Sequence, residues 1–211
     1  MSFIPQDLDL LGTFLASADD VIPLREVAEG NTDEKVIALR HDIDSDLQRS
    51  LRFAQWENAR GFRASYFVLH TVPYYTDKTQ VNNTLHELQR LGHEIGLHND
   101  AVTVALQQGA EDPIAAAMDI LEVELKVLRD EGFEIVGTAA HGSALCKEHG
   151  VNNMEVFDRF DPEQLGLEYA AYKLHRGMNY VSDNGGEWRS PRVLMPDRQT
   201  HVLCHPQHWP V

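Results

Sequence analysis

Short apolar runs alternate with helical patterns along most of this sequence, and this alternation limits the possible fold more than any other feature. The clearest predicted strands are Lys35–Asp42, Arg63–His70, Glu94–His98 and Phe133–His141. Parallel neighbouring strands need a long crossover connection, which the intervening helices supply. We therefore expect an α/β chain with a parallel sheet of about six strands, either open or closed into a (β/α) barrel.

The helices between these strands carry recognisable ends. In the longest, Pro113–Glu131, Asp112 is placed to cap the first turn. Further along, the pattern predicts a helix at Glu163–Leu174 and strands at Asn179–Asp183 and Thr200–His205. No repeat or linker interrupts the sequence, so we expect one domain over residues 1–211, in which residues 1–34 form a lead-in segment.

Composition and charge exclude several function classes. Lys and Arg number 18 against 33 Asp and Glu, and the resulting formal charge of −15 repels nucleic-acid phosphates and anionic lipid surfaces. The N-terminus has acidic residues where a signal peptide has basic ones, and no apolar run is long enough to cross a membrane. Cys146 and Cys204 lie far apart and form no metal-binding spacing. The expected location is the reducing cytoplasm.

Acidic and histidine side chains stand where the predicted strands end. Asp42 and Asp44 close the first strand, His98 the third, His141 the fourth and His205 the last. Active sites of (β/α) barrels lie at the carboxyl ends of the strands, and residues two apart on a strand share a face. Carboxylate and imidazole groups that meet there are ligands that zinc and similar divalent ions accept. The pattern therefore predicts a hydrolase-type metal site.

Several nearby residues have a simpler structural interpretation. Asp44, Ser45 or Asp46 can instead cap the helix that follows the first strand. His41 alternates away from Asp42 along that strand, which favours a role in packing or in supporting the site residues from behind. The segment GHEIGLH lacks the H-E-x-x-H spacing of zinc proteases, so we expect His93 to be structural or exposed.

Five segments in chain order, ALRHDID, RASYFVL, GHEIGLH, AHGS at Ala140–Ser143 and the terminal CHPQHW, resemble the polysaccharide deacetylase (carbohydrate esterase, NodB-homology) superfamily. The resemblance covers the chain from about Lys35 to Trp209. It implies a divergent member with an irregular (β/α) barrel of about seven parallel strands in a single domain. It also implies a divalent-metal site inside the barrel, with zinc as the first choice of metal.

By position, the resemblance implies roles for particular residues. Asp42 matches the family's general base, His98 a metal ligand and His205 the late histidine that acts as general acid. The family's second aspartate is a metal ligand and normally adjoins the first. Ile43 stands at that position here, so Asp44 is assigned the ligand role.

Two departures from the family pattern concern the remaining ligand. Val102 stands where the family usually has a second histidine, four residues after His98. The family's third motif carries an arginine and a proline, whereas Thr138–Ala140 precede His141 in this chain. His141 is placed to supply the missing ligand from the end of the fourth strand. The expected metal ligands are therefore Asp44, His98 and His141.

The expected function is metal-dependent hydrolysis of a C–N bond other than a peptide bond, namely removal of an acetyl group from an N-acetylated sugar or polysaccharide precursor. Asp42 would accept a proton from the attacking water and His205 would donate one to the departing amine. The candidate substrate-binding residues are Asp183, Trp188, Arg189 and Tyr75. Trp188 and Tyr75 can stack on a sugar ring or simply bury area, and Asp183 can orient His205, hold substrate hydroxyls or belong to a plain turn.

Two other functions fit the same sequence. One keeps the metal and changes the substrate to a small or nucleotide-linked amide in the cytoplasm. The other is a catalytically inactive deacetylase-like barrel that binds a carbohydrate or a partner, which Val102 at the usual histidine position motivates. The expected partner is a carbohydrate or small-molecule amide, with no nucleic acid and no membrane insertion.

Overall fold

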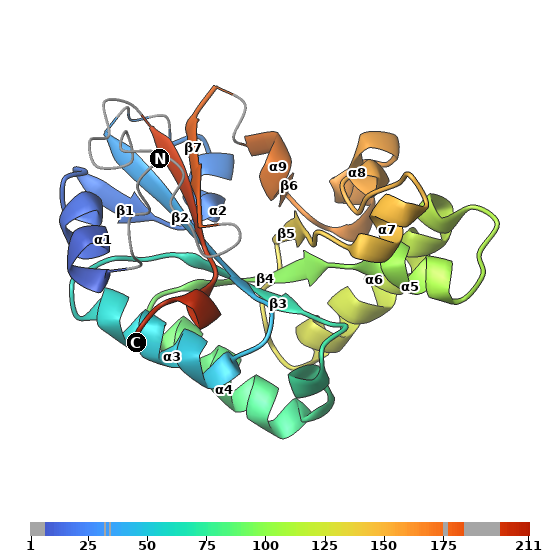
Figure 1. Cartoon of the computed structure of the whole chain (residues 1–211), viewed down its shortest axis with the longest axis horizontal. Helices are drawn as coiled ribbons and strands as arrows, with labels where there is room; N and C mark the ends of the chain where they lie inside the picture. Colours follow the sequence, from blue (N-terminus) through green and yellow to red (C-terminus); the bar gives the residue numbers. More distant parts are fainter. Residues whose placement is uncertain (1–6, 32, 34, 175–176, 184–198) are drawn as a thin grey trace.

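The computed structural model describes residues 7–31, 33, 35–174, 177–183 and 199–211 (Figure 1). Its first part contains α1 (Leu8–Leu15), β1 (Asp20–Ile22), α2 (Leu24–Ala28), β2 (Val36–Ile43), α3 (Leu47–Asn58), β3 (Ser65–Leu69), η1 (Pro73–Thr76), α4 (Lys78–Arg90), β4 (Glu94–Asn99) and α5 (Ala101–Gln107). There follow α6 (Pro113–Asp130), β5 (Gly137–Ala140), α7 (Ala144–Glu148), α8 (Glu155–Arg159), η2 (Pro162–Leu165), β6 (Tyr169–Ala170), α9 (Ala171–Leu174), β7 (Asn179–Ser182), β8 (Thr200–Cys204) and η5 (Pro206–His208).

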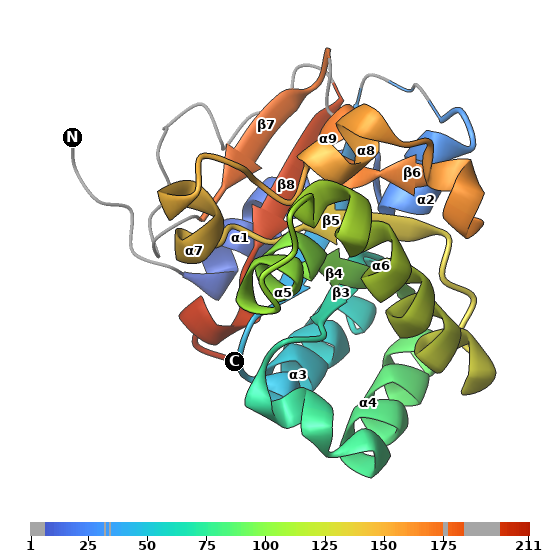
Figure 2. The ribbon, with the colours of Figure 1, turned by 90° about the vertical axis from the view of Figure 1, so that its right-hand side faces the viewer.

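One parallel sheet organises the chain. Seven strands follow the order β6-β5-β4-β3-β2-β8-β7, and β1 pairs with β2 beside this path. The sheet curls into a half-barrel, and among the described residues its outer strands β6 and β7 do not pair with each other (Figure 2). The predicted α/β fold, an irregular (β/α) barrel with about seven parallel strands, is thereby confirmed.

The two faces of the curled sheet have different contents. The inner face holds a small apolar cluster that includes Ala38, Phe67 and Tyr169, whereas the larger core lies between the sheet and the helices outside it. The large inner side chains Phe67 and Tyr169 leave no room for a side chain on the strand beside each of them. A Cβ atom on Gly96 would lie 2.3 Å from Phe67, and one on Gly137 would lie 2.1 Å from Tyr169. Glycine is therefore required where these rings fill the lower part of the half-barrel.

Aspartate caps fix where helices begin after the strands. Asp46 accepts a hydrogen bond from the backbone N–H of Arg49 at the start of α3, and Asp112 accepts one from Ala115 at the start of α6. The predicted cap at Asp112 is therefore confirmed, and Asp46 takes the capping role that was one of its two interpretations. Asp44 is thereby left free of helix capping.

The structure corrects several predicted boundaries. The fourth strand covers only Gly137–Ala140 of the predicted Phe133–His141. The predicted helix at Glu163–Leu174 is instead η2, β6 and α9, because Gly166 adopts the left-handed region with φ 65° and turns the chain. Residues 8–28 of the lead-in segment form α1, β1 and α2, and α5 was not predicted.

Candidate functional site

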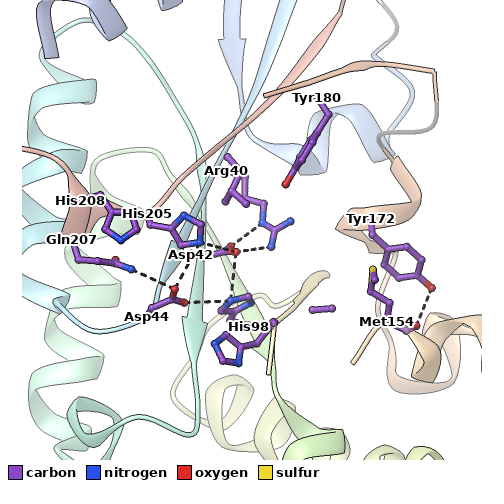
Figure 3. A pocket seen from close by; sticks show the side chains of 14 residues that line it. Arg40, Asp42, Asp44, His98, Met154, Tyr172, Tyr180, His205, Gln207 and His208 are labelled. Atoms are coloured by element: carbon purple, nitrogen blue, oxygen red, sulfur yellow. Dashed lines mark hydrogen bonds and ion pairs between the residues drawn. The ribbon is translucent and has the colours of Figure 1, made fainter. Parts of the chain in front are cut away.

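A cavity of about 460 Å³ opens at the carboxyl end of the strands (Figure 3). Its lining includes Asp42 and Asp44 from the end of β2, His98 from β4, His141 just after β5 and His205 just after β8. The structure thus brings together every predicted catalytic and metal-ligating residue. Their meeting follows from the parallel sheet, because its strands all end at the same edge.

Asp44, His98 and His141 form a compact group within this cavity. One potential ligand atom from each lies within 4.8 Å of the others, and Asp44 Oδ1 is 3.4 Å from His98 Nε2. His98 Nδ1 donates a hydrogen bond of 2.9 Å to the carbonyl oxygen of Ala139, so its proton is on that nitrogen. A neutral His98 therefore presents the lone pair of Nε2 to the carboxylate, and hydrogen-bond acceptors behind metal-binding histidines impose the same orientation.

The donor set of this group fits a divalent metal. Asp44 Oδ1 is buried and has no hydrogen-bond partner among the described residues, although it faces a histidine nitrogen. An acceptor oxygen and a nitrogen lone pair that face each other at contact distance are both satisfied by a cation between them. One carboxylate and two imidazoles are also typical zinc ligands that leave a coordination position open.

Val102, which stands at the family's usual second-histidine position, is fully buried in α5. The third member of the group, His141, comes from the end of the neighbouring strand β5, whose register pairs Ala140 with Asn99 of β4. The two histidine rings lie 5.1 Å apart and almost perpendicular to each other. Pairing of β4 with β5 therefore places His141 beside His98.

Asp42 is held by an arginine that the sequence analysis did not single out. Arg40 lies two residues earlier on the same face of β2, and its Nε and Nη2 donate hydrogen bonds of 2.8 and 2.6 Å to the two carboxylate oxygens. Burial is the largest single effect and favours the neutral acid, but the charge and hydrogen bonds of Arg40, together with the charges of His98 and His205, outweigh it and lower the pKa of Asp42 far below its usual range. The period-two spacing of Arg40 and Asp42 was the available signal.

His205 forms a dyad with Asp183. Its Nδ1 donates a hydrogen bond of 2.6 Å to Asp183 Oδ1, while its Nε2 lies 3.7 Å from Asp44 Oδ2 and 4.0 Å from Asp42 Oδ2. Asp183 also accepts hydrogen bonds of 2.8 Å from the backbone N–H of His205 and the indole N–H of Trp209. Burial lowers the pKa of His205, but the hydrogen bond to Asp183 and the neighbouring carboxylates produce a net rise.

Of the remaining predicted substrate-binding residues, the structure describes only Tyr75. Tyr75 lies away from the cavity lining: its hydroxyl contacts Glu124 at 3.1 Å, and its ring packs against the ammonium group of Lys78. Trp188 and Arg189 lie outside the described residues. Tyr172 and Tyr180, which the sequence analysis did not propose, are the aromatic side chains on the wall across from Asp44 (Figure 3).

Histidines predicted to be structural lie behind the site. His41 is fully buried on the other face of β2, where its Nε2 contacts Glu57 Oε1 at 2.6 Å. His93 accepts a hydrogen bond from the backbone N–H of Ala64. These contacts confirm the packing role predicted for His41 and the structural role predicted for His93.

Comparisons with known proteins assign no family to this chain. A scan against models of known protein families finds no match, and a search of curated proteins finds none either. Within the described part of the chain, no helix combines the length and apolar character needed to cross a membrane.

Proposed function

We propose that this chain is a metal-dependent hydrolase that removes an acetyl group from an N-acetylated sugar or polysaccharide precursor, as a divergent polysaccharide deacetylase. The observation that carries the proposal is the close group of Asp44, His98 and His141 beside the His205–Asp183 dyad. A possible metal site and a positioned proton carrier lie in one cavity. Amide hydrolysis requires both functions, because water is a poor nucleophile and an amine is a poor leaving group.

Asp44, His98 and His141 would hold the divalent ion, for which zinc is the first choice. When bound, such an ion supplies Lewis acidity that polarises an amide carbonyl and makes water a stronger acid. The chain itself supplies the orientation of the ligands. The Ala139 carbonyl holds the His98 ring with Nε2 toward Asp44, so little rearrangement is needed to accept the ion.

Asp42 would accept the proton of the attacking water. Arg40 keeps this carboxylate ionised at every physiological pH and fixes the direction of both oxygens. The lowered pKa weakens Asp42 as a base, so the proposed role would require a water of raised acidity. Arg40 also supplies the counter-charge that an ionised, almost fully buried carboxylate requires.

His205 would donate a proton to the departing amine. Asp183 keeps the Nδ1 proton in place, so the second proton of the imidazolium is on Nε2, which points toward Asp42 and Asp44. The raised pKa of His205 increases the protonated fraction near neutral pH. A protonated imidazole at this position can supply the proton that an amine needs in order to leave.

A small amide remains a second candidate substrate, and the size of the cavity favours it. About 460 Å³ lies within the usual range for small-molecule sites. A cytoplasmic N-acetylated precursor and a nucleotide-linked amide are both small molecules of the kind that such a cavity holds. Tyr172 and Tyr180 on the cavity wall offer stacking surfaces to either substrate.

The proposal is tested first by the metal content of protein purified without an affinity tag. We expect near-stoichiometric zinc or a similar ion in the wild type and its loss in Asp44→Ala and His98→Ala. Asp46→Ala and His149→Ala are the matched controls, because Asp46 caps α3 and His149 is exposed. A folded wild type that takes up no ion even after dialysis against zinc contradicts the proposal.

Hydrolysis is then measured on a panel of N-acetylated sugars and small amides. We expect acetate release that depends on the metal and falls at least a hundredfold in His205→Ala. A protein that binds metal but releases acetate or another acid from no member of the panel supports the binding-module alternative instead.

A further inference from the structure

Asp100 lies directly behind His141 at the start of α5. Its Oδ1 is 3.3 Å from His141 Nδ1, an ion-pair distance, and that nitrogen is buried without a hydrogen-bond partner among the described residues. The carboxylate is itself almost fully buried, with an exposed fraction of 4%. Asp100 is not part of the cavity lining, whereas His141 is. A proton on Nδ1 that faces Asp100 would leave Nε2 as the nitrogen that can bind an ion.

Other donors hold the Asp100 carboxylate in one orientation. Thr71 donates a hydrogen bond of 2.8 Å to Oδ2, while Thr103 and the side-chain amide of Asn153 donate to Oδ1. The same Asn153 amide donates to the carbonyl oxygen of His141 at 2.9 Å. The carboxylate and the backbone of His141 therefore belong to one hydrogen-bonded unit, and the ring of His141 contacts the carboxylate at 3.3 Å.

We propose that Asp100 is the positioning residue for His141 as a metal ligand: its carboxylate holds the Nδ1 proton and directs Nε2 toward Asp44 and His98. This inference rests on the proposed function, because it assumes that the group of Asp44, His98 and His141 holds an ion. The inference gives Asp100, which has no role in the proposed mechanism so far, a function in the metal site. It also explains how a histidine on the exit from β5 can serve where α5 presents the buried Val102.

The arrangement has the parts of a carboxylate–histidine–metal relay. Partners of this kind fix the ring orientation and increase the basicity of the ligand, and their loss typically weakens metal binding about 10–100-fold. His98 has a neutral carbonyl, Ala139 O, at the equivalent place. The charged partner on His141 therefore makes it the stronger donor of the two imidazoles.

The test compares Asp100→Asn with Thr71→Val in the full chain. Asparagine keeps the size of the side chain and an acceptor oxygen but removes the charge. Thr71→Val removes a hydrogen bond from Oδ2, the oxygen away from His141, and serves as the control for simple loosening of the cluster. Zinc affinity is measured by competition with a chelator, and the Co²⁺-loaded proteins are compared by visible absorption at saturating metal.

We expect zinc affinity to fall about 10–100-fold in Asp100→Asn and to change less than about threefold in Thr71→Val. The Co²⁺ spectrum should shift in Asp100→Asn alone, because a purely structural role does not alter the ligand field once the site is full. Wild-type affinity and spectrum in a folded Asp100→Asn overturn the inference while leaving the proposed function intact. A wild type that binds no metal overturns both.

If Asp100→Asn does not fold, His141→Gln tests the premise of the inference, which is that His141 is a metal ligand. The zinc affinities of His141→Gln and Asp44→Ala are compared. The inference requires that His141→Gln, like Asp44→Ala, lower the zinc affinity at least about tenfold. Wild-type zinc affinity in His141→Gln contradicts the inference, because a residue that is not a ligand needs no positioning partner.

Discussion

The two faces of β2 carry similar side chains in opposite situations. On the outer face, Glu57 Oε1 contacts His41 at 2.6 Å and Oε2 accepts a hydrogen bond of 2.7 Å from the Tyr66 hydroxyl. On the inner face, Asp42 and Asp44 meet His98 and His205 at the wall of a cavity. Both faces therefore have a carboxylate beside an imidazole.

What differs is whether the carboxylate oxygens are already satisfied. Each oxygen of Glu57 has a partner, and the group is fully buried in the core. Asp44 Oδ1 has no hydrogen-bond partner in the described part of the chain, and it adjoins an open volume. A buried carboxylate whose oxygens both have partners stabilises a fold, whereas a buried acceptor oxygen without a partner beside a cavity is able to bind a ligand.

The largest expected effect comes from Asp42→Asn on the inner face. We expect acetate release to fall about 10²–10⁴-fold, because the proton acceptor is lost. We also expect a loss of about 3–5 kcal/mol in the free energy of unfolding, because the buried charge of Arg40 loses its partner. Steady-state kinetics and urea denaturation measure the two effects.

The double variant Arg40→Met/Asp42→Leu separates these two effects. It should regain most of the lost stability and none of the activity, since well-packed apolar residues replace a buried ion pair at little cost. Activity within about threefold of wild type in Asp42→Asn contradicts the role of Asp42 as general base.

On the outer face, Glu57→Leu should change stability and leave the chemistry alone. The His41 and Tyr66 groups lose their acceptor, so we expect the free energy of unfolding to fall by about 2–4 kcal/mol. Glu57→Gln keeps an acceptor oxygen and should cost less. Metal content per folded molecule of Glu57→Leu should match wild type. Loss of metal from a stable Glu57→Leu protein would contradict the assignment of structural and ligand-binding roles to the two faces of β2.

His70 is a buried histidine whose effect on stability can be tested by changing the pH. Its Nε2 accepts a hydrogen bond from the backbone N–H of Asp100, and burial is the main cause that lowers the pKa of His70 from 6.5 to about 4. Between these values the unfolded chain binds a proton that the folded chain does not. Stability is therefore full above pH 6.5 and falls as the pH approaches 4, by up to roughly 3 kcal/mol.

His70→Gln keeps an acceptor for the Asp100 N–H and cannot take up the proton. Metal-free His70→Gln should therefore lose less stability than wild type on acidification from pH 7 to pH 4, as measured by denaturation at each pH. The exposed His149→Gln is the control and should follow the wild-type curve. Parallel curves for His70→Gln and wild type contradict this assignment.

The smallest expected effect is that of Trp209→Phe. This variant removes one donor to Asp183 Oδ2 and leaves the hydrogen bond between Asp183 and the His205 ring in place. We expect a loss of about 1 kcal/mol in stability and a rate decrease below about tenfold. Asp183→Asn should reduce the rate more, and equal losses in the two variants show that the indole bond orients His205 as much as the ring contact does.

Strands and their ends were accessible from the sequence, but side-chain partners across strands were not. The apolar runs that became β2, β3, β4 and β8 are buried, so their patterns were strong. Gly166 interrupts the predicted helix at Glu163–Leu174 with a backbone turn that periodicity does not reveal. Tyr75 and Tyr172 could not be told apart as wall residues, because their positions depend on how the sheet curls.

Local sequence patterns determine the order of strands and helices and place acidic and histidine residues at the strand ends. They also account for the helix caps at Asp46 and Asp112. Such patterns depend on neighbours in the chain, where propensity, periodicity and capping act. Other features depend on strand register, the curl of the sheet and burial. These are the hydrogen bonds from Arg40 to Asp42, the His205–Asp183 dyad and the position of Asp100 behind His141. These properties arise only when distant segments pack, because the packed protein determines which polar groups find partners and which remain open to a ligand.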